Sequence, residues 1–491
     1  MWRSGGQSVL LDAEESRAID RAAIEQHGIA AATLMAAAAA GAARVARGRF
    51  PRAQRVLVVG GGGQNGGDGF EVARLLRLAG RDARVVRVAS RPSTGAAAEM
   101  LQAALLAGVP VRESPTGSIE DDLLSVDLVV DALLGTGATG APRGGVAAAI
   151  SAITASGLPV LALDIPSGVD ASTGEVPGVV IQAVVTATFH AEKVGLRVMP
   201  GLLRAGTVVT VPIGAPTGPP GRITLVQQGS VRRRGRAGSK YDAGVVVVIG
   251  GATGMTGAPA LAASAALRAG AGVVIALVPP AIVSTVAMRR SEVMVRPIVD
   301  ASEVPLLAER ADAIVIGPGL GREPAAADIV RQALAVDVPV VVDADALWWL
   351  AQDPSLLGRR RAVTVLTPHA GEAARLLQVD SGEIAAHRLA SVRDIAERTG
   401  AICVLKGSDT LLAASDGRCA IRAGDNAGLA TAGAGDVLSG IIGAFIARND
   451  DPWQAVQAAT LAHLAAADAA AARRSGAIMA GDLIEHLPVF E

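Results

Sequence analysis

Glycines and polar side chains gather in one short stretch near the N-terminus. Seven of the ten residues 60–69 are glycine, and the other three are Gln64, Asn65 and Asp68. Glycine lets the backbone approach a ligand closely, and the N–H groups of such a loop bind anions. A local alternative is that Asp68 starts a helix, because Glu71 three residues later completes a capping-box pattern. Capping alone does not require so many glycines, so the stretch also predicts a binding loop.

The same stretch has the spacing G-x-G-x-x-G at Gly61, Gly63 and Gly66. An ordinary dinucleotide-binding fold also needs an acidic residue at the end of the next strand, where it holds the ribose. The next apolar segment, residues 83–88, is followed by Ala-Ser-Arg-Pro-Ser and therefore lacks one. This absence argues against the usual dinucleotide loop.

Two later apolar segments of the first half also end in polar residues. Asp131 closes the run LVVD, and Asp164 closes the run VLALD, with Ser167 in the turn that follows. The carboxyl ends of parallel strands meet at one edge of an α/β sheet, where ligands bind. We therefore expect these residues to share a crevice with Asn65 and Asp68, although any one aspartate alone is more often a helix cap. The oxygen atoms of Asn65, Asp131 and Ser167 could also hold a hard cation.

The second half contains one strong motif, NAGLATAGAGDVLSGIIGAF at residues 426–445. Gly433, Gly435 and Asp436 precede an apolar helix, whose first N–H groups and dipole favour a bound anion. Asp436 in this place could take a proton from a hydroxyl that attacks a phosphoryl group. The alternative is that Asp436 only caps the helix.

Other loops of the second half carry side chains suited to a nucleotide. Lys406, Gly407 and Thr410, in VLKGSDT, suit phosphate or ribose contacts. His369 stands in a Pro-His turn before a helix, where it fits either a helix cap or a ligand contact. The run VVDADAL adds two aspartates. The sequence G-x-x-x-x-G-K-[ST] does not occur, which excludes a P-loop enzyme.

Short apolar runs alternate with alanine-rich helical segments along the whole chain, which predicts βαβ units and parallel sheets. The clearest strands are expected at residues 55–59, 83–88, 128–130, 159–163, 245–249, 273–277, 313–316, 339–342, 363–366 and 401–405. The Gly- and Pro-rich stretch 212–238 interrupts this rhythm. We therefore predict two doubly wound α/β domains, residues 1–222 and 223–491, with the basic run 232–236 either in a solvated linker or at the lip of a site.

Composition limits the partners and the location. The 45 basic and 46 acidic side chains give a net charge of −1, which predicts no broad positive field for nucleic acid. Only Cys403 and Cys419 occur, which fits a reducing compartment, and the first residues lack a signal-peptide pattern. The weakly polar stretch 29–43 is mostly alanine and too short to cross a bilayer, so we expect a buried helix there. These features predict a cytoplasmic protein with neither membrane nor nucleic-acid partners.

Three segments within residues 10–215 together resemble the NAD(P)H-hydrate epimerase family: GGGGQNGGDGF, VVDALLGTGATG and ALDIPSGVDASTGEV. The resemblance implies a Rossmann-like domain that interconverts the two epimers of NADH or NADPH hydrated on the nicotinamide ring. It implies substrate contacts from Gln64, which replaces the family's usual Asn, and from Asn65, Gly66, Gly67, Asp68, Gly135, Thr136, Gly137, Ala138, Thr139, Gly140, Ala141 and Asp164. It also implies a potassium ion on Asn65, Asp131 and Ser167. Epimerisation needs a base near the hydrated carbon, and Asp164 is the predicted one. Lys193 is either its partner or a surface lysine.

Six segments within residues 238–488 resemble the ADP- or ATP-dependent NAD(P)H-hydrate dehydratase family of the ribokinase-like superfamily: GGATGMTGAPALAASAALRAGAGVV, EVMVRP, GPGLG, LTPHAGE, VLKGSDT and GAGD. The resemblance implies hydrate contacts from Ala258, Gly319, His369 and Asp436. It implies nucleotide contacts from Lys406, Gly407, Ser408, Asp409, Thr410 and Gly435, with magnesium accompanying ADP or ATP. Ala432 and Ala434 replace the family's usual Gly and Thr, so the backbone donors remain but one hydroxyl is lost.

Together the two resemblances imply a metabolite-repair enzyme with two activities. The first domain would interconvert the epimers, and the second would phosphorylate the ring hydroxyl of the S epimer and then eliminate phosphate. A small-alcohol kinase of the ribokinase type is the nearest alternative, and it explains the second half only. A non-catalytic nucleotide sensor is another alternative, but a sensor needs neither Asp164 nor Asp436. We expect a homo-oligomer that acts on hydrated NADH or NADPH with ADP or ATP.

Overall fold

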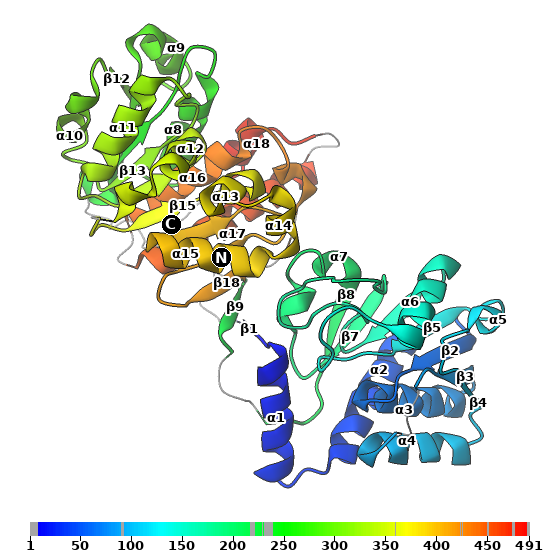
Figure 1. Ribbon diagram of the computed structural model, residues 1–491. Helices are drawn as coiled ribbons and strands as arrows, with labels where there is room; N and C mark the ends of the chain where they lie inside the picture. The colour runs from blue at the N-terminus through cyan, green and yellow to red at the C-terminus, as the bar shows by residue number, and fades with distance from the viewer. Residues whose placement is uncertain are drawn as a thin grey trace. The chain divides into compact units, whose positions relative to one another are not determined.

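The chain forms two compact units in the computed structural model, each with a mainly parallel sheet (Figure 1). Val9–Ile223 is one unit, and Ser8 with the residues from Thr224 onward is the other. The structure describes residues 8–89, 93–216, 221–227, 229, 239–358, 360–422, 424, 426–448, 451–473 and 477–488. The basic run 232–236, expected in a linker or at the lip of a site, lies outside these residues.

The N-terminal unit contains a seven-stranded sheet in the order β4-β3-β2-β5-β6-β7-β8. Its strands are β2 (Arg55–Gly60), β3 (Asp82–Arg87), β4 (Val111–Glu113), β5 (Leu128–Ala132), β6 (Val160–Leu163), β7 (Val185–Phe189) and β8 (Thr207–Val211). All neighbouring pairs are parallel. The chain winds outward from β2 in one direction and from β5 in the other, so the strand order reverses between these two strands. Ligands bind at such a switch point, beyond the carboxyl ends of the strands.

Helices cover both faces of this sheet. The helices of this unit are α1 (Ala13–Glu25), α2 (Ala31–Arg49), α3 (Gln64–Leu78), α4 (Gly95–Leu106), α5 (Glu120–Leu123), α6 (Gly144–Ser156) and α7 (Leu202–Ala205). Alternate residues of β2 point to opposite faces, so Val58 packs with α2 and α3 while Leu57 and Val59 pack with α6. The helix expected at residues 29–43 is confirmed as α2, and much of it is buried.

The sheet of the C-terminal unit contains the order β18-β17-β16-β15-β14-β13-β10-β11-β12. Its strands are β10 (Val245–Ile249), β11 (Val273–Val278), β12 (Met294–Pro297), β13 (Ala313–Ile316), β14 (Val340–Val342), β15 (Thr364–Leu366), β16 (Ile402–Leu405), β17 (Leu411–Ala413) and β18 (Cys419–Arg422). The strands from β16 to β12 pair in parallel, with the switch point between β10 and β13. The strands β17 and β18 are antiparallel to their neighbours. Short strands β1 (Ser8–Leu10) and β9 (Ile223–Val226) occur where the two units divide.

Helices of the C-terminal unit also pack on its sheet. They are α8 (Gly257–Arg268), α9 (Val283–Ala287), α10 (Val304–Leu307), α11 (Pro324–Ala335), α12 (Asp345–Gln352), α13 (Ala370–Leu377), α14 (Ser381–Ala386), α15 (Arg388–Thr399), α16 (Ala434–Ile446), α17 (Pro452–Arg473) and α18 (Ala480–Glu485). Short 3₁₀ turns lie at Val194–Leu196, Tyr241–Ala243, Pro280–Ile282, Ala301–Glu303, Pro354–Leu357 and Ala427–Leu429. One apolar cluster joins α8, α16, α17 and α18 to β10 and β13.

The prediction of two α/β domains is confirmed, and each of the ten expected strands is present within two residues of its expected bounds. Among the helices that the structure describes, none combines the length and apolar character needed to cross a membrane.

Candidate active sites

A cavity of about 600 Å³ lies at the switch point of the N-terminal unit. Its wall is formed by residues 61–65 after β2, by residues 133–138 after β5, and by Asp164, His190 and Lys193 beyond β6 and β7. Residues of α1 and α2 line much of the remainder, together with Asp68, Val146, Phe189 and Ile213. The three predicted strand ends therefore converge on one cavity.

Most of the predicted substrate-binding residues line this cavity. They are Gln64, Asn65, Asp68, Gly135, Thr136, Gly137, Ala138 and Asp164. Gly66, Gly67, Thr139, Gly140 and Ala141 are not part of the lining.

Asp68 does not start the helix, so the capping alternative is wrong. Helix α3 begins at Gln64, its N-cap is Gly63, and Asp68 lies one turn inside it at 8% exposure.

Close packing of the backbone explains two of the glycines in this stretch. A Cβ atom at Gly61 would strike the carbonyl oxygen of Leu133, and one at Gly66 would strike that of Gly61. These two glycines are therefore required by the close approach of protein backbone, independently of any ligand.

Lys193 is buried, so the alternative of a surface lysine is wrong. Its side chain is 1% exposed, and its Nζ lies 2.6 Å from Oδ1 of Asp164. The ammonium also donates to the carbonyl oxygen of Phe189 at 2.6 Å and to Oγ1 of Thr188 at 3.2 Å. Three acceptors thus hold Lys193 in place beside the predicted base.

The backbone of Asp164 is strained, with φ at 64°. This left-handed conformation is unfavourable for a residue with a Cβ atom, and such strain is found at functional sites. The Asp164 N–H donates to the carbonyl oxygen of Ala187 at 2.8 Å, which fixes the turn after β6.

Titratable side chains in the cavity influence one another. Burial raises the pKa of Asp68 well above its ordinary value, and the negative charges of Asp164 and Asp20 raise it further. Burial, followed by the nearby charge of Lys193, lowers the pKa of His190. Sequence reasoning missed Asp20, on α1, because nothing in a helical aspartate signals that it faces a cavity.

Asn65, Asp131 and Ser167 form a polar cluster at the wall of the cavity, where Asn65 is part of the lining. The Oγ of Ser167 donates to Oδ1 of Asp131 at 2.7 Å, and Nδ2 of Asn65 donates to the carbonyl oxygen of Leu134 at 2.7 Å. Burial raises the pKa of Asp131 to about 6, although hydrogen bonds from Ser167 oppose this shift. The Oδ1 atom of Asn65 is buried and has no hydrogen-bond partner in the described part of the chain. A buried acceptor without a donor suits a cation, as predicted for these three residues.

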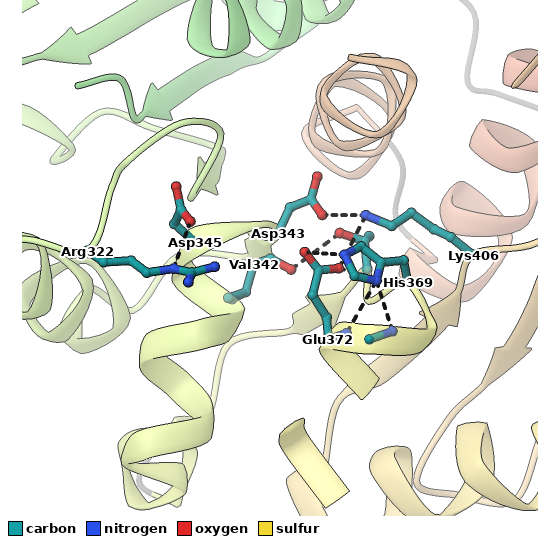
Figure 2. A network of polar contacts seen from close by, with 9 residues as sticks. Arg322, Val342, Asp343, Asp345, His369, Glu372 and Lys406 are labelled. Carbon is teal, nitrogen blue, oxygen red and sulfur yellow. Dashed lines mark hydrogen bonds and ion pairs between the residues drawn. The ribbon is translucent and has the colours of Figure 1, made fainter. Parts of the chain in front are cut away.

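The second site lies at the carboxyl ends of strands in the C-terminal unit. Figure 2 shows Lys406 reaching Asp343 and Glu372. Its Nζ lies 2.8 Å from Oδ1 of Asp343 and 3.7 Å from Oε2 of Glu372. Burial opposes the charge of Lys406, but these two carboxylates outweigh it and raise its pKa. A Cβ atom added at Gly435 would lie 3.3 Å from the same Nζ, so the predicted nucleotide residues Lys406 and Gly435 face each other.

Asp436 is not a helix cap, so that alternative is wrong too. The N-cap of α16 is Gly433, with φ at 86°, and Asp436 is the third residue of the helix. Its side chain has no hydrogen bond or ion pair within the described residues. Burial raises the pKa of Asp436 to about 7, and the charge of Asp343 contributes next. The structure therefore places an unpaired carboxyl beside the ion pair of Lys406.

His369 caps α13, as one of its two predicted roles requires. Its Nδ1 accepts hydrogen bonds from the N–H groups of Gly371 at 3.0 Å and Glu372 at 3.3 Å. The side chain is 56% exposed, and its Nε2 lies 3.4 Å from Oε1 of Glu372. Gly319 and Ala258, the other predicted hydrate contacts, are neighbours, because a Cβ atom at Gly319 would lie 3.1 Å from that of Ala258.

The loop of residues 406–410 is held from beneath. Arg388 lies 2.9 and 2.7 Å from the two carboxylate oxygens of Asp409, and both side chains are at most 8% exposed. Thr410 donates its hydroxyl to the carbonyl oxygen of Gly407 at 2.9 Å, while Gly407 and Ser408 are exposed. The carboxylate of Asp409 thus faces Arg388, which sequence reasoning missed.

Comparisons with known proteins assign a family to each half of the chain. The NAD(P)H-hydrate dehydratase family matches residues 246–489, and a family described as YjeF-related protein N-terminus matches residues 31–195. The bifunctional NAD(P)H-hydrate repair enzyme of Coxiella burnetii is 36% identical over 98% of this chain and 99% of its own length. The chain belongs to the family of bifunctional NAD(P)H-hydrate repair enzymes. The repair enzyme of Moorella thermoacetica is 40% identical over 89% of this chain and 87% of its own length.

Among solved structures, the ADP/ATP-dependent NAD(P)H-hydrate dehydratase of Bacillus subtilis, crystallised with ATP and Mg²⁺, is 28% identical. The match covers 53% of this chain and 92% of that one, with a TM-score of 0.48. The expectation of a bifunctional NAD(P)H-hydrate repair enzyme is thus confirmed by the sequence relatives, which span nearly the whole chain.

Proposed function

We propose that residues 1–222 epimerise the R and S forms of hydrated NADH or NADPH, and that residues 223–491 dehydrate the S form at the expense of ADP or ATP. Dehydration would give NADH or NADPH, phosphate, and AMP or ADP. The observation that carries the proposal is that each unit has its own polar site at the carboxyl ends of its parallel strands. Membership of the bifunctional repair enzymes supports the pairing of the two activities.

In the epimerase unit, Asp164 is the base and Lys193 positions it. Asp164 lines the cavity, and the ion pair at 2.6 Å holds its carboxylate in one orientation. The first turn of α3, residues 64–68, and the segment 135–141 would bind the hydrated dinucleotide, with backbone N–H groups available to its phosphates.

Potassium belongs to the same proposal, on Asn65, Asp131 and Ser167. The unpartnered Oδ1 of Asn65 fits a cation, and a cation would also stabilise the buried carboxylate of Asp131. Its role would be to fix the loop after β5 beside the cavity. Titration of the apoprotein with KCl, in a buffer free of potassium, should raise both its melting temperature and its epimerase rate. Asn65→Leu should abolish both responses, and an unchanged response would contradict the site.

In the dehydratase unit, Asp436 would take the proton of the ring hydroxyl as that oxygen accepts a phosphoryl group. Lys406 and the N–H groups at the start of α16 would neutralise the charge of the transferred group. Phosphate is a better leaving group than hydroxide, which is why a kinase-like step can serve a dehydration. Nucleotide contacts are assigned to Lys406, Gly407, Ser408, Asp409, Thr410 and Gly435. Hydrate contacts are assigned to Ala258, Gly319, His369 and Asp436.

Magnesium would arrive with the nucleotide, because phosphate oxygens and water fill most of its coordination shell. The part of the chain that the structure describes contains no group of three or more His, Cys, Asp or Glu side chains placed to hold a metal ion by themselves. One or two carboxylates together with the phosphates would be enough.

The test is to incubate the protein with both epimers of NADPH hydrate, ADP and Mg²⁺, and to follow the absorbance of regenerated NADPH. Complete conversion supports both activities. Recovery of the S fraction alone, after correction for spontaneous epimerisation, would contradict the epimerase assignment. No recovery with either ADP or ATP would contradict the dehydratase assignment and favour a small-alcohol kinase. A homo-oligomeric state and a cytoplasmic location stay predictions, which sedimentation and cell fractionation would test.

A further inference from the structure

The cavity of the N-terminal unit contains a second carboxyl group that the mechanism above leaves unused. Asp68 lines the cavity and is 8% exposed. Within the described residues its side chain has neither a hydrogen-bond partner nor an ion pair. Unpaired buried carboxyl groups are uncommon in folded proteins, because a lost hydrogen bond destabilises the fold. A function in the cavity would explain why one is present here.

The charged surroundings of Asp68 differ from those of Asp164. Asp20 and Arg17 on α1, Asp164 after β6, and His190 and Lys193 after β7 all line the same cavity. The ammonium of Lys193 is bound to Asp164, and none of the residues that the structure describes forms an ion pair with Asp68. Burial and the neighbouring carboxylates raise the pKa of Asp68 well above its ordinary value, which favours its protonated form. Two carboxyl groups in one site whose environments differ in this way are suited to act as acid and base.

We propose that Asp68 is the proton donor of the epimerase, working opposite Asp164 as the proton acceptor. The inference rests on the proposed epimerase function. Water adds to an enamine double bond at the carbon bonded to nitrogen, so the hydrated ring carbon bears both a hydroxyl group and the ring nitrogen. Such a centre inverts when its carbon–nitrogen bond breaks and forms again.

The step balances with these two side chains alone. Asp164 takes the hydroxyl proton, the carbon–oxygen bond becomes a carbonyl, and the carbon–nitrogen bond breaks. Its electron pair goes to the nitrogen, which takes the proton of Asp68. After the aldehyde rotates, the nitrogen attacks its opposite face and returns that proton to Asp68. Asp164 returns the other proton to oxygen, and both carboxyl groups regain their starting states.

The test measures the interconversion of separated epimers by the full chain without nucleotide, with spontaneous epimerisation subtracted. Asp68→Asn keeps the size of the side chain but cannot donate the carboxyl proton. We expect its kcat to fall about 10²- to 10⁴-fold, with the KM for the hydrate changed only a few-fold. The matched control is Glu71→Gln, which removes a carboxyl of similar burial from the same helix. Glu71 pairs with Arg74 and does not line the cavity, so its kcat should be unchanged.

The pH profile separates an acid from a structural residue. The wild-type kcat should fall as pH rises through the pKa of Asp68, and Asp68→Asn should lose this alkaline limb. Wild-type kcat in Asp68→Asn, or a raised KM alone, would overturn the proposal. If Asp68→Asn fails to fold, the wild-type profile still decides, because a missing alkaline limb overturns it as well. A wild-type chain that does not interconvert the epimers at all would instead overturn the proposed epimerase.

Discussion

Each unit has a lysine–aspartate ion pair at its candidate site. The aspartate is the more exposed partner in one pair, and the lysine is the more exposed partner in the other. In the N-terminal unit the side chain of Lys193 is 1% exposed while that of Asp164 is 11% exposed. In the C-terminal unit the side chain of Lys406 is 20% exposed while that of Asp343 is 1% exposed. The first site therefore presents a carboxylate to its ligand, and the second presents an ammonium. A carboxylate suits proton removal and an ammonium suits phosphate, which agrees with the roles proposed for Asp164 and Lys406.

The two sites also share a feature, an unpaired carboxyl beside the ion pair. Asp68 has this position in the first unit and Asp436 in the second, and burial raises the pKa of both. The proposed roles differ in direction, because Asp68 donates a proton while Asp436 accepts one. Variants that alter one site only should separate these roles, since both activities can be measured on the same chain.

The largest effect is expected from Asp436→Asn. An amide cannot accept the hydroxyl proton, so dehydration should slow about 10³-fold or more. Binding of ADP should persist, because Lys406 and the loop after β16 are intact. Calorimetry with ADP and single-turnover formation of NADPH would measure the two effects. Epimerase activity of the same variant is the internal control, and its loss would point to a folding defect.

Because the more exposed partner differs between the two ion pairs, we expect different consequences when the lysine of each pair is replaced by methionine. Lys406→Met should weaken nucleotide binding and lower the melting temperature, because Asp343 would be left buried without its partner. Lys193→Met should leave nucleotide binding intact and slow epimerisation about 10²-fold, since Asp164 loses the group that orients it. Thermal unfolding, ADP titration and both activity assays would be compared. The contrast between the sites fails if both variants change the same activity.

The dehydratase should lose activity as pH falls, whereas the epimerase should lose activity as pH rises. Asp436 accepts a proton only when ionised, and its pKa is raised to about 7. The kcat/KM of dehydration should therefore fall about tenfold for each pH unit well below pH 7. The charge of Asp345 contributes to this shift, so Asp345→Asn should move the limb to lower pH. If activity falls at the same pH in Asp345→Asn as in the wild type, a group other than Asp436 controls the pH dependence.

The smallest effect is expected from Arg388→Lys, which keeps the charge but loses the two-point contact with Asp409. The nucleotide loop would be held less firmly, and the KM for ADP should rise about fivefold, on the order of 1 kcal/mol. The control is Arg398→Lys on the same helix, where an exposed pair with Asp394 is lost without expected effect. Equal KM values in both variants would show that Arg388 does not position the loop.

Much of the fold could be predicted because buried parallel strands leave a strong pattern. Continuous runs such as Val245–Ile249 are apolar on both faces, since helices cover both sides of the sheet. The hairpin of β17 and β18 was missed, although Asp416-Gly417 between two apolar runs is a turn signal. Its strands are only three and four residues long, too short for their alternation to be clear.

The sequence by itself determined which side chains end the strands and thus where both sites lie. A glycine-rich turn or an aspartate after an apolar run is a local feature, and parallel strands bring such features to one edge. Only the tertiary structure decided that Lys193 is buried more deeply than Lys406, that Asp68 lies inside a helix, and that Arg388 reaches Asp409. These properties depend on which distant segments pack over each side chain. Burial and pairing in turn set the charges, so local sequence could locate the chemistry but not assign its acid and base.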